Sequence, residues 1–414
     1  MEEWKEYKLK DICIKITDGS HSSPKGLDDG YPMFSVKDMQ EYGFDYSKCK
    51  YVSYNDFLSL KQNDCVPQKG DVLVAKDGSY LKQIFVCKET KDEGVLSSIA
   101  IFRPNTLIDS FFLCYLLKSP EVYNYIANNC VSGSALPRIV LKDFKEVKLR
   151  VPSLAKQKEI VSILKSLDDK IEVNRKINEN LEQQAQALFK SWFVDFEPFK
   201  NGEFIESELG RIPKGWRVGT VDDVCCFESG FAFKSTTYKQ EGEYRLITIK
   251  NVQDGYLDVN GSVCLDELPA KMPQYCLLRI GDILLSLTGN VGRCCFVDEE
   301  RLLLNQRVAK LKPRIKNNWG YIYTLFRNPS FKDRVVSIAR GTAQANLSPI
   351  ETSNMKIIIP IDKVLEDFSA IVDESYRIMI NNMIESRRLA ELRDTLLPKL
   401  MSGELKVNEI ENRL

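Results

Sequence analysis

The sequence predicts a duplicated α/β (α+β) fold: two globular domains separated by two long helices that pair as an antiparallel coiled coil with pseudo-twofold symmetry. Two observations predict it. Residues 31–45 (YPMFSVKDMQEYGFD) align without a gap with residues 244–258 (YRLITIKNVQDGYLD), at an offset of 213. After Pro152, the spacing of apolar residues changes to that of a long helix. A repeat this long indicates that one structural plan is used twice.

The repeat extends over most of the chain. Residues 70–79 match 281–290 at an offset of 211, residues 98–104 match 307–313 at 209, and the offset is 208 from Gly133 onward. Offsets that drift by one or two residues are typical of small loop insertions between copies. We therefore predict four parts: domain 1 over 1–152, the first long helix and connector over 153–211, domain 2 over 212–360, and the second long helix and tail over 361–414.

Each globular domain is predicted to mix strands with helices. Short β-branched runs such as YRLITIKNV (244–252) and GDILLSL (281–287) lie between Gly, Asp and Asn residues, which is typical of strands and turns. Residues 108–129 (IDSFFLCYLLKSPEVYNYIANN) are predicted to form a helix.

The segment after Pro152 has a heptad pattern. Steps of four and three residues join Ile160, Leu164, Leu167, Ile171, Asn174, Asn178, Leu181, Ala185, Leu188 and Trp192. Adding 208 gives a weaker seam through Phe368, Val372, Ser375, Met379, Asn382, Ser386, Leu389, Arg393, Leu396 and Leu400. Polar residues in both seams, Asn174 and Asn382, could fix the register of an antiparallel pair. The alternative is two separate amphipathic helices, each lying on its own domain.

Composition is that of an ordinary globular protein. The chain has 58 basic and 58 acidic side chains, and its longest apolar run, residues 111–117, is far too short to span a membrane. The N-terminal residues lack the apolar stretch of a secretory signal. Twelve cysteines without a Cys-x-x-Cys pair indicate free thiols rather than a disulfide scaffold. We therefore expect a cytoplasmic protein without membrane segments.

Motifs of catalysis are missing from the sequence. There is no Gly-x-Gly for a dinucleotide or S-adenosylmethionine loop and no Gly-Lys for a Walker A loop. No Pro-Asp is present to begin a nuclease metal site, and His21 is the only histidine, which nearly excludes His-based zinc sites and catalytic pairs. We predict no catalytic residue, no metal site and no cofactor in this chain.

Charge is distributed unevenly despite the neutral total. Residues 212–360 contain 20 basic and 15 acidic side chains, and residues 301–316 hold six cations without an acid. Such a basic stripe could contact phosphates. The alternative is a solvated strand edge protected by Lys and Arg.

Matched loops in the two repeats combine turn residues with polar, basic and aromatic side chains. Residues 17–26 correspond to 228–238, and residues 76–82 correspond to 287–293. Such mixtures suit phosphate contact and the reading of base edges, although simple turns have a similar composition. The candidate DNA contacts are Ser20, His21, Ser22, Lys25, Lys37, Lys76, Ser79, Tyr80, Lys82 and Arg138 in domain 1, and Phe231, Phe233, Lys234, Ser235, Lys250, Asn290, Arg293, Gln306, Arg307, Lys310, Lys312, Arg340 and Gln344 in domain 2.

These features together resemble the specificity subunits of type I restriction-modification enzymes. The resemblance covers essentially the whole chain and includes ALFKSWFVDFEPFK at 187–200, LRDTLLPKLMSGEL at 392–405, IPKGWRVGTVDDV at 212–224 and NQRVAKLKP at 305–313. The family's run after the first domain is present at Pro152, Gln157 and Ile160, whereas the second copy has Leu365 where Gln157 would align.

The resemblance implies a non-catalytic subunit that binds double-stranded DNA. In that family, each globular domain reads one half of a split, asymmetric sequence. The paired helices set the spacing and dock two modification subunits, which methylate adenine, and restriction subunits join that core. S-adenosylmethionine, ATP and Mg are then expected on the partner subunits.

The residues expected to form the helix pair and its partner-binding surface are Ile160, Leu164, Leu167, Ile171, Asn174, Leu181, Leu188, Trp192, Phe368, Met379, Asn382, Leu389 and Leu396. Two other functions remain open from the sequence. The chain could be a structural adaptor whose coiled coil and globular parts bind proteins, or a stand-alone methyltransferase or nuclease, which the missing motifs argue against.

Overall fold

A computed structural model describes residues 4–78, 80–133, 137–341 and 345–407 of the chain. The chain divides into two compact units, one formed by residues 1–172 and 388–414 and the other by residues 173–387. Each unit contains one globular domain and a part of both long helices, α6 (Leu154–Phe189) and α11 (Asp362–Ser402). The domain boundaries at residues 152, 211 and 360 stay a prediction.

The globular part of the first unit contains short strands and helices in alternation. A central antiparallel sheet has the order β2-β10-β7-β8, formed by Cys13–Asp18, Ile99–Pro104, Val72–Ala75 and Ile84–Val86. A second sheet has the order β6-β3-β9, formed by Lys50–Val52, Tyr31–Phe34 and Gly94–Val95. The other strands pair as β1 (Lys5–Lys8) with β13 (Lys148–Val151), β4 (Met39–Gln40) with β5 (Gly43–Phe44), and β11 (Val131–Ser132) with β12 (Arg138–Ile139). The helices are α1 (Leu9–Ile12), α2 (Tyr54–Gln62), α3 (Ser110–Lys118), α4 (Pro120–Asn129) and α5 (Leu141–Lys145).

The second unit repeats both sheets of the first in the same strand order. Its central sheet has the order β17-β23-β20-β21, formed by Cys225–Ser229, Val308–Pro313, Ile283–Ser286 and Cys294–Phe296. Its second sheet has the order β19-β18-β22, formed by Cys264–Leu265, Tyr244–Ile247 and Leu302–Leu304. The strands β16 (Arg217–Thr220) and β24 (Lys356–Ile359) pair as β1 and β13 do, and a hairpin of β14 (Phe204–Ser207) and β15 (Gly210–Pro213) follows the first long helix. The helices are α7 (Val221–Val224), α8 (Trp319–Arg327), α9 (Pro329–Ser337) and α10 (Pro349–Ser353).

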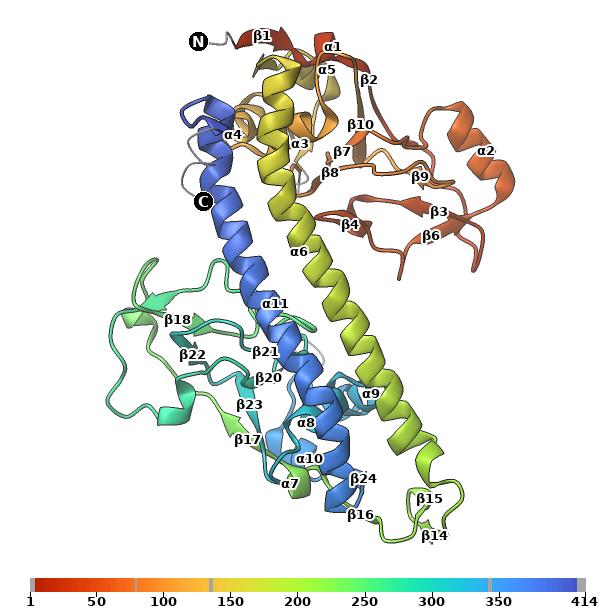
Figure 1. The fold of residues 1–414 in the computed structure, drawn as a ribbon, viewed down its shortest axis with the longest axis vertical. Coiled ribbons are helices and arrows are strands. Elements are labelled where there is room, and N and C mark those ends of the chain that lie inside the picture. The colour runs from red at the N-terminus through yellow and green to blue at the C-terminus, as the bar shows by residue number, and fades with distance from the viewer. Residues whose placement is uncertain (1–3, 79, 134–136, 342–344, 408–414) are drawn as a thin grey trace. The chain divides into compact units, whose positions relative to one another are not determined.

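Identical strand order and direction confirm the predicted duplication. In both repeats the second sheet combines one antiparallel and one parallel pair, β3 with β6 and β9, and β18 with β19 and β22. Figure 1 shows each four-stranded sheet within its own unit.

Both faces of each central sheet are buried, which explains the continuous apolar runs. In β7, Val72 and Val74 face one core cluster while Leu73 and Ala75 face another. In β20, Ile283 and Leu285 face one cluster while Leu284 faces a second. Because neighbouring side chains of a strand point to opposite faces, such strands lose the usual alternation of apolar and polar residues.

The helix predicted over residues 108–129 is two helices. The α3 helix ends at Lys118 and α4 begins at Pro120. Proline lacks the N–H that would continue the helical hydrogen bonds, and it moves the preceding residue out of the helical region. The break is at Ser119, whose ψ is 139°.

The strand predicted over residues 244–252 is also shorter. The β18 strand ends at Ile247, and a turn follows in which the Thr248 N–H and hydroxyl both donate to Asn251 Oδ1. The first repeat has the same turn, with Ser35 donating to Asp38 Oδ2. Side-chain bonds of this kind compete with the strand ladder and end it.

The long helices pair through the predicted seam, antiparallel in the second unit. There, the Asn174 amide donates to Glu385 Oε2 at 2.7 Å and to Ser386 Oγ at 3.2 Å, while the Asn178 amide donates to the Met379 carbonyl at 3.1 Å. The later residue of α6 contacts the earlier residue of α11, so the two helices run in opposite directions. The alternative of two unpaired helices is therefore wrong.

The seam residues occupy different environments. Ile160, Leu164, Phe368 and Met379 are buried, and Leu181, Leu188, Trp192 and Leu396 pack partly buried against the core clusters. Leu167, Ile171, Asn382 and Leu389 are half-buried, and Asn174 is fully buried.

Gln157 fixes the start of α6 to the first domain. Its side chain is completely buried, accepts from the Asp109 N–H at 2.8 Å, and donates to the carbonyls of Leu107 and Pro152. Leu365, at the same position of the second repeat, is buried in an apolar cluster. The departure from the family pattern thus replaces a polar anchor by an apolar one in the interior.

We expect Gln157→Leu to lower the free energy of unfolding by about 3 kcal/mol, because an N–H and two carbonyls would lose their buried partner. Urea unfolding of the full chain measures this. Lys158→Leu, on the exposed side of the same turn, is the matched control and should change stability by less than about 0.5 kcal/mol. An equal loss in both variants would contradict the anchoring role.

Candidate functional site

In each unit, loops far apart in the sequence converge at one end of the central sheet. In the first unit, Ser20 forms a bridge with Leu96, and Asp77 forms one with Arg138. The Lys76 N–H donates to the Ser98 carbonyl at 2.9 Å, which joins the loop after β7 to the loop before β10. The loops following β2 and β7 and preceding β10 and β12 therefore form one cluster.

The second unit builds the same cluster. Phe231 forms a bridge with Asn305, and Thr288 forms one with Asn346. The Gly289 N–H donates to the Ala345 carbonyl at 2.8 Å, as the Gly78 N–H donates to the Pro137 carbonyl in the first unit. The backbone scaffold is repeated, and we name the two sets of loops the first and second loop clusters.

The side chains on the two scaffolds differ in charge. In the first loop cluster, Lys76 is buried and lies 3.0 Å from Asp18 Oδ2 and 3.6 Å from Asp77 Oδ1. His21 Nε2 lies 3.3 Å from the other oxygen of Asp18 and is 78% exposed. The second loop cluster has neutral groups at the corresponding places, where Thr288 Oγ1 donates to Asn346 Oδ1 at 3.1 Å. One scaffold thus presents two different hydrogen-bonding surfaces.

Several predicted contact residues lie exposed on these clusters. They are Ser22, Lys25, Lys82 and Arg138 in the first unit, with Ser20 half-buried beside His21, and Lys234, Ser235, Asn290, Gln306, Arg307 and Arg340 in the second. Lys37 and Lys250 are exposed in the turns that follow β3 and β18. Ser79 and Gln344 lie outside the described residues.

Other predicted contact residues are buried or already make contacts within the protein. Phe233 is 7% exposed and packs against Leu246, Leu265 and Leu303, so it is a core residue rather than the exposed side chain that the sequence predicts. Lys76 is buried and ion-paired, and Tyr80 packs partly buried against the apolar cluster that contains Val72 and Val74. The Arg293 guanidinium donates to Gln253 Oε1 at 2.6 Å. Sequence reasoning missed Asp18, Asp77, Thr288 and Asn346, although the aligned offsets place Asp77 with Thr288 and Arg138 with Asn346.

The basic segment 301–316 is not a continuous stripe. The β23 strand, which carries Lys310 and Lys312, lies between β17 and β20, so these two cations do not protect a strand edge. Lys312 lies 3.3 Å from Glu228 Oε1, and Arg314 lies 2.7 Å from Asp222 Oδ1. Of the six cations, Arg301, Arg307 and Lys316 are exposed without an ion pair among the described residues. The phosphate contacts of Lys310 and Lys312 stay a prediction.

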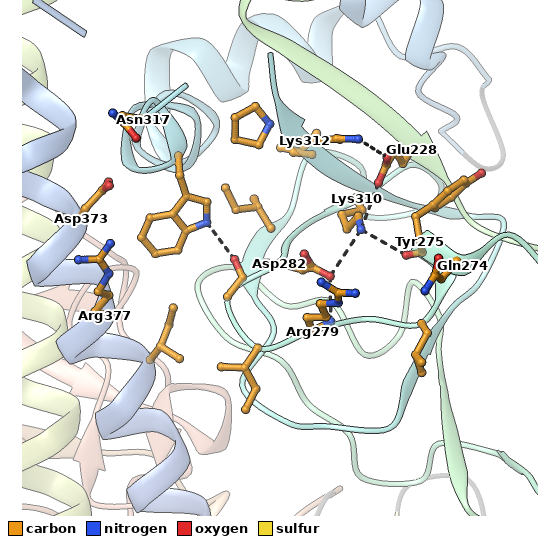
Figure 2. A pocket seen from close by; sticks show the side chains of 18 of the residues that line it. Glu228, Gln274, Tyr275, Arg279, Asp282, Lys310, Lys312, Asn317, Asp373 and Arg377 are labelled. Carbon is orange, nitrogen blue, oxygen red and sulfur yellow. Dashed lines mark hydrogen bonds and ion pairs between the residues drawn. The ribbon is translucent and has the colours of Figure 1, made fainter. Parts of the chain in front are cut away.

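Lys310 lies in the wall of a cleft of about 940 Å³ in the second unit (Figure 2). Its ammonium lies 3.1 Å from Glu228 Oε2 and 3.7 Å from Asp282 Oδ2, and it donates to the Tyr275 carbonyl. Burial raises the pKa of Asp282, which the charge of Lys310 opposes. Lys310 therefore compensates two acids that are largely removed from water.

Comparison with known proteins decides the family. The family model described as "Type I restriction modification DNA specificity domain" matches residues 1–183 and 213–385. The chain belongs to this family. It is 30% identical to the type I restriction enzyme MjaIX specificity subunit of Methanocaldococcus jannaschii, over 99% of this chain and 95% of that one. It is 25% identical to the type I restriction enzyme HindI specificity subunit of Haemophilus influenzae, over 98% of this chain and all of that one.

The fold of this specificity subunit agrees with a solved structure. The crystal structure of a type I restriction-modification system S subunit from M. genitalium covers 96% of this chain with a TM-score of 0.54 and 16% identity. Within the part of the chain that the structure describes, no helix is long and apolar enough to cross a membrane. All twelve cysteines are free thiols, as predicted.

We expect Lys310→Met to lower the free energy of unfolding by about 2 kcal/mol at pH 7, because Glu228 and Asp282 would lose their shared cation. Burial already raises the pKa of Asp282, and without the Lys310 charge that pKa should rise further in the folded variant. An acid with a raised folded-state pKa destabilises the fold at high pH, and that cost disappears as it protonates. The deficit relative to the original chain should therefore shrink between pH 7 and pH 5.

Urea unfolding at both pH values measures this effect. Lys316→Met removes an exposed charge nearby and serves as the control, with little change expected at either pH. A deficit for Lys310→Met that is independent of pH would mean that the lost contacts are apolar.

Proposed function

We propose that this specificity subunit reads a split, asymmetric DNA sequence, with one half-site bound by each loop cluster. The observation that carries the proposal is the repeated backbone scaffold with different side chains. A carboxylate accepts hydrogen bonds from the amino groups of cytosine or adenine, whereas amides and hydroxyls both donate and accept. Two such surfaces on one scaffold suit two different half-sites.

The helix pair supplies the spacing and the attachment of partners in this proposal. Its polar seam fixes the register of two antiparallel helices, and a fixed register gives a fixed length. Two modification subunits would dock on the pair and bring S-adenosylmethionine to adenine, and restriction subunits with ATP and Mg would join them. This subunit would itself be non-catalytic and act in the cytoplasm.

Neutral overall charge suits a subunit that shares its grip on DNA with partners. Affinity from phosphate contacts falls steeply with salt, so a chain without net positive charge should bind weakly alone. If the chain were instead an adaptor for proteins, a titration would show no sequence-dependent, salt-sensitive DNA binding.

Exchange of residues 1–152 for the first domain of another specificity subunit tests the assignment of half-sites. We expect one half of the methylated sequence to change and the other half to stay, because each scaffold reads independently. Methylome sequencing of a host that expresses the hybrid with the modification subunit reports both halves at once. A sequence that is unchanged, or changed in both halves, would exclude one reader per half-site.

Insertion of one heptad into each long helix, at the same level of the seam, tests the role in spacing. Seven residues lengthen a helix by about 10 Å, which corresponds to roughly three base pairs of B-DNA. The spacer of methylated sites should lengthen accordingly while both half-sites are retained. An unchanged spacer in an active insertion variant would contradict the role of the helices in setting the spacing.

A further inference from the structure

One hairpin is repeated in both domains and meets the long helices in both units. In the first unit, β4 and β5 enclose the two-residue turn Glu41-Tyr42, with Gln40 opposite Gly43. In the second unit, Val252 forms a bridge with Leu257 around the turn Asp254-Gly255. The gapless alignment places Glu41 on Asp254, so the same turn carries an acid in each repeat.

In the first unit an arginine joins this turn to both helices. Arg393 of α11 lies 2.8 Å from Glu41 Oε1 and 2.7 Å from Asp168 Oδ1 of α6. Tyr42 and Tyr115 also donate to Asp168, at 3.0 and 2.6 Å. Asp168 is 10% exposed and Arg393 is 15% exposed, so water screens their attraction little.

In the second unit, an arginine of the globular domain joins the turn to α6. Arg327, at the end of α8, lies 2.5 Å from Glu182 Oε1 of α6 and also pairs with Asp254. Lys332 of α9 lies 2.6 Å from the second oxygen of Asp254. Burial alone would raise the pKa of Asp254, but the charges of Arg327 and Lys332 lower it below its usual value.

The residue that follows the turn acid accommodates or contacts the arginine in each unit. Gly255 has a φ of 92°, and a Cβ there would lie 3.1 Å from the Arg327 guanidinium. At the same position of the first repeat, Tyr42 extends its hydroxyl to Asp168 and lies 3.3 Å from Arg393. One turn leaves room for the arginine, and the other adds a hydrogen bond to it.

We propose that these two acid–arginine–acid triads, Glu41–Arg393–Asp168 and Asp254–Arg327–Glu182, set the orientation of each recognition domain on the helix pair and thereby restrict the spacing between half-sites. The inference rests on the proposed function. A planar guanidinium holds two carboxylates in fixed directions, which a point charge cannot do. In this proposal the triads act as positioning groups and read no base.

The variants Glu41→Gln and Asp254→Asn test the proposal. Both turn acids are about half exposed, at 47% and 43%, so their neutral isosteres should leave the domains folded. Glu121→Gln and Asp333→Asn neutralise exposed acids on helices of the same two domains and are the matched controls. Each chain is expressed with its modification subunit, and methylome sequencing gives half-sites and spacer lengths. Thermal melting of the purified complexes verifies folding.

We expect both turn variants to keep their half-site sequences and to methylate sites with a spacer one base pair too long or too short. The preference for the native spacer should fall about fivefold, which is about 1 kcal/mol, the upper range for a partly exposed ion pair. Arg327→Lys should give a smaller fall, because lysine keeps the charge and loses the fork. The controls should keep the native preference.

Three results would overturn the proposal while leaving the proposed function intact. They are an unchanged spacer preference in both folded turn variants, an equal change in the controls, or a change of one half-site sequence, which would make the turn a reader of bases. Methylation of an unsplit sequence by the original chain would instead refute the proposed function. The two failures are therefore distinguishable.

Discussion

The buried asparagine in the otherwise apolar seam of the helix pair is the constraint on which the rest of the structure depends. Asn174 is fully buried, so its amide nitrogen needs acceptors, and it donates to Glu385 and Ser386 on the facing helix. A shift by one helical turn would leave these groups unsatisfied in an apolar seam, which costs more than the hydrogen bonds themselves contribute. A fixed register then decides which side chain of each helix meets each domain, Asp168 and Arg393 in the first unit and Glu182 in the second.

The two repeats keep their backbone and change their surface. The bridges between Asp77 and Arg138 and between Thr288 and Asn346 join equivalent loops, although one pair is charged and the other neutral. Backbone hydrogen bonds hold both scaffolds, so side chains at the loop clusters are free to differ without loss of the fold. Buried strands, in contrast, remain apolar on both faces in both copies, because any polar group there would need a partner.

Sequence reasoning was accurate where local pattern controls the structure. The repeat, the heptad seam and the presence of an asparagine in both seams follow from spacing alone. It failed where distant residues decide the outcome. The pairing of Lys310 with Glu228 bridges 82 positions, Arg393 meets Glu41 across 352 positions, and Phe233 is buried by strands that only the fold brings together. The loop clusters were predicted in part. The aligned offsets identified which loops of the two repeats are equivalent, but they did not show which loops contact one another.

If the triads orient the domains as proposed, the different origins of the two arginines limit how freely the domains can be exchanged. Domain 2 carries Arg327 itself and needs only Glu182 from α6, so a replacement domain must bring its own arginine. Domain 1 receives Arg393 from α11 and contributes only the acid of its turn, Glu41. A replacement for domain 1 without a turn acid would leave Arg393 paired only with Asp168 and Asp394 of the long helices, so the ion pair between Arg393 and the turn would be lost. Recognition surfaces can therefore vary widely, whereas the hairpin that faces the helices must match the helices that receive it.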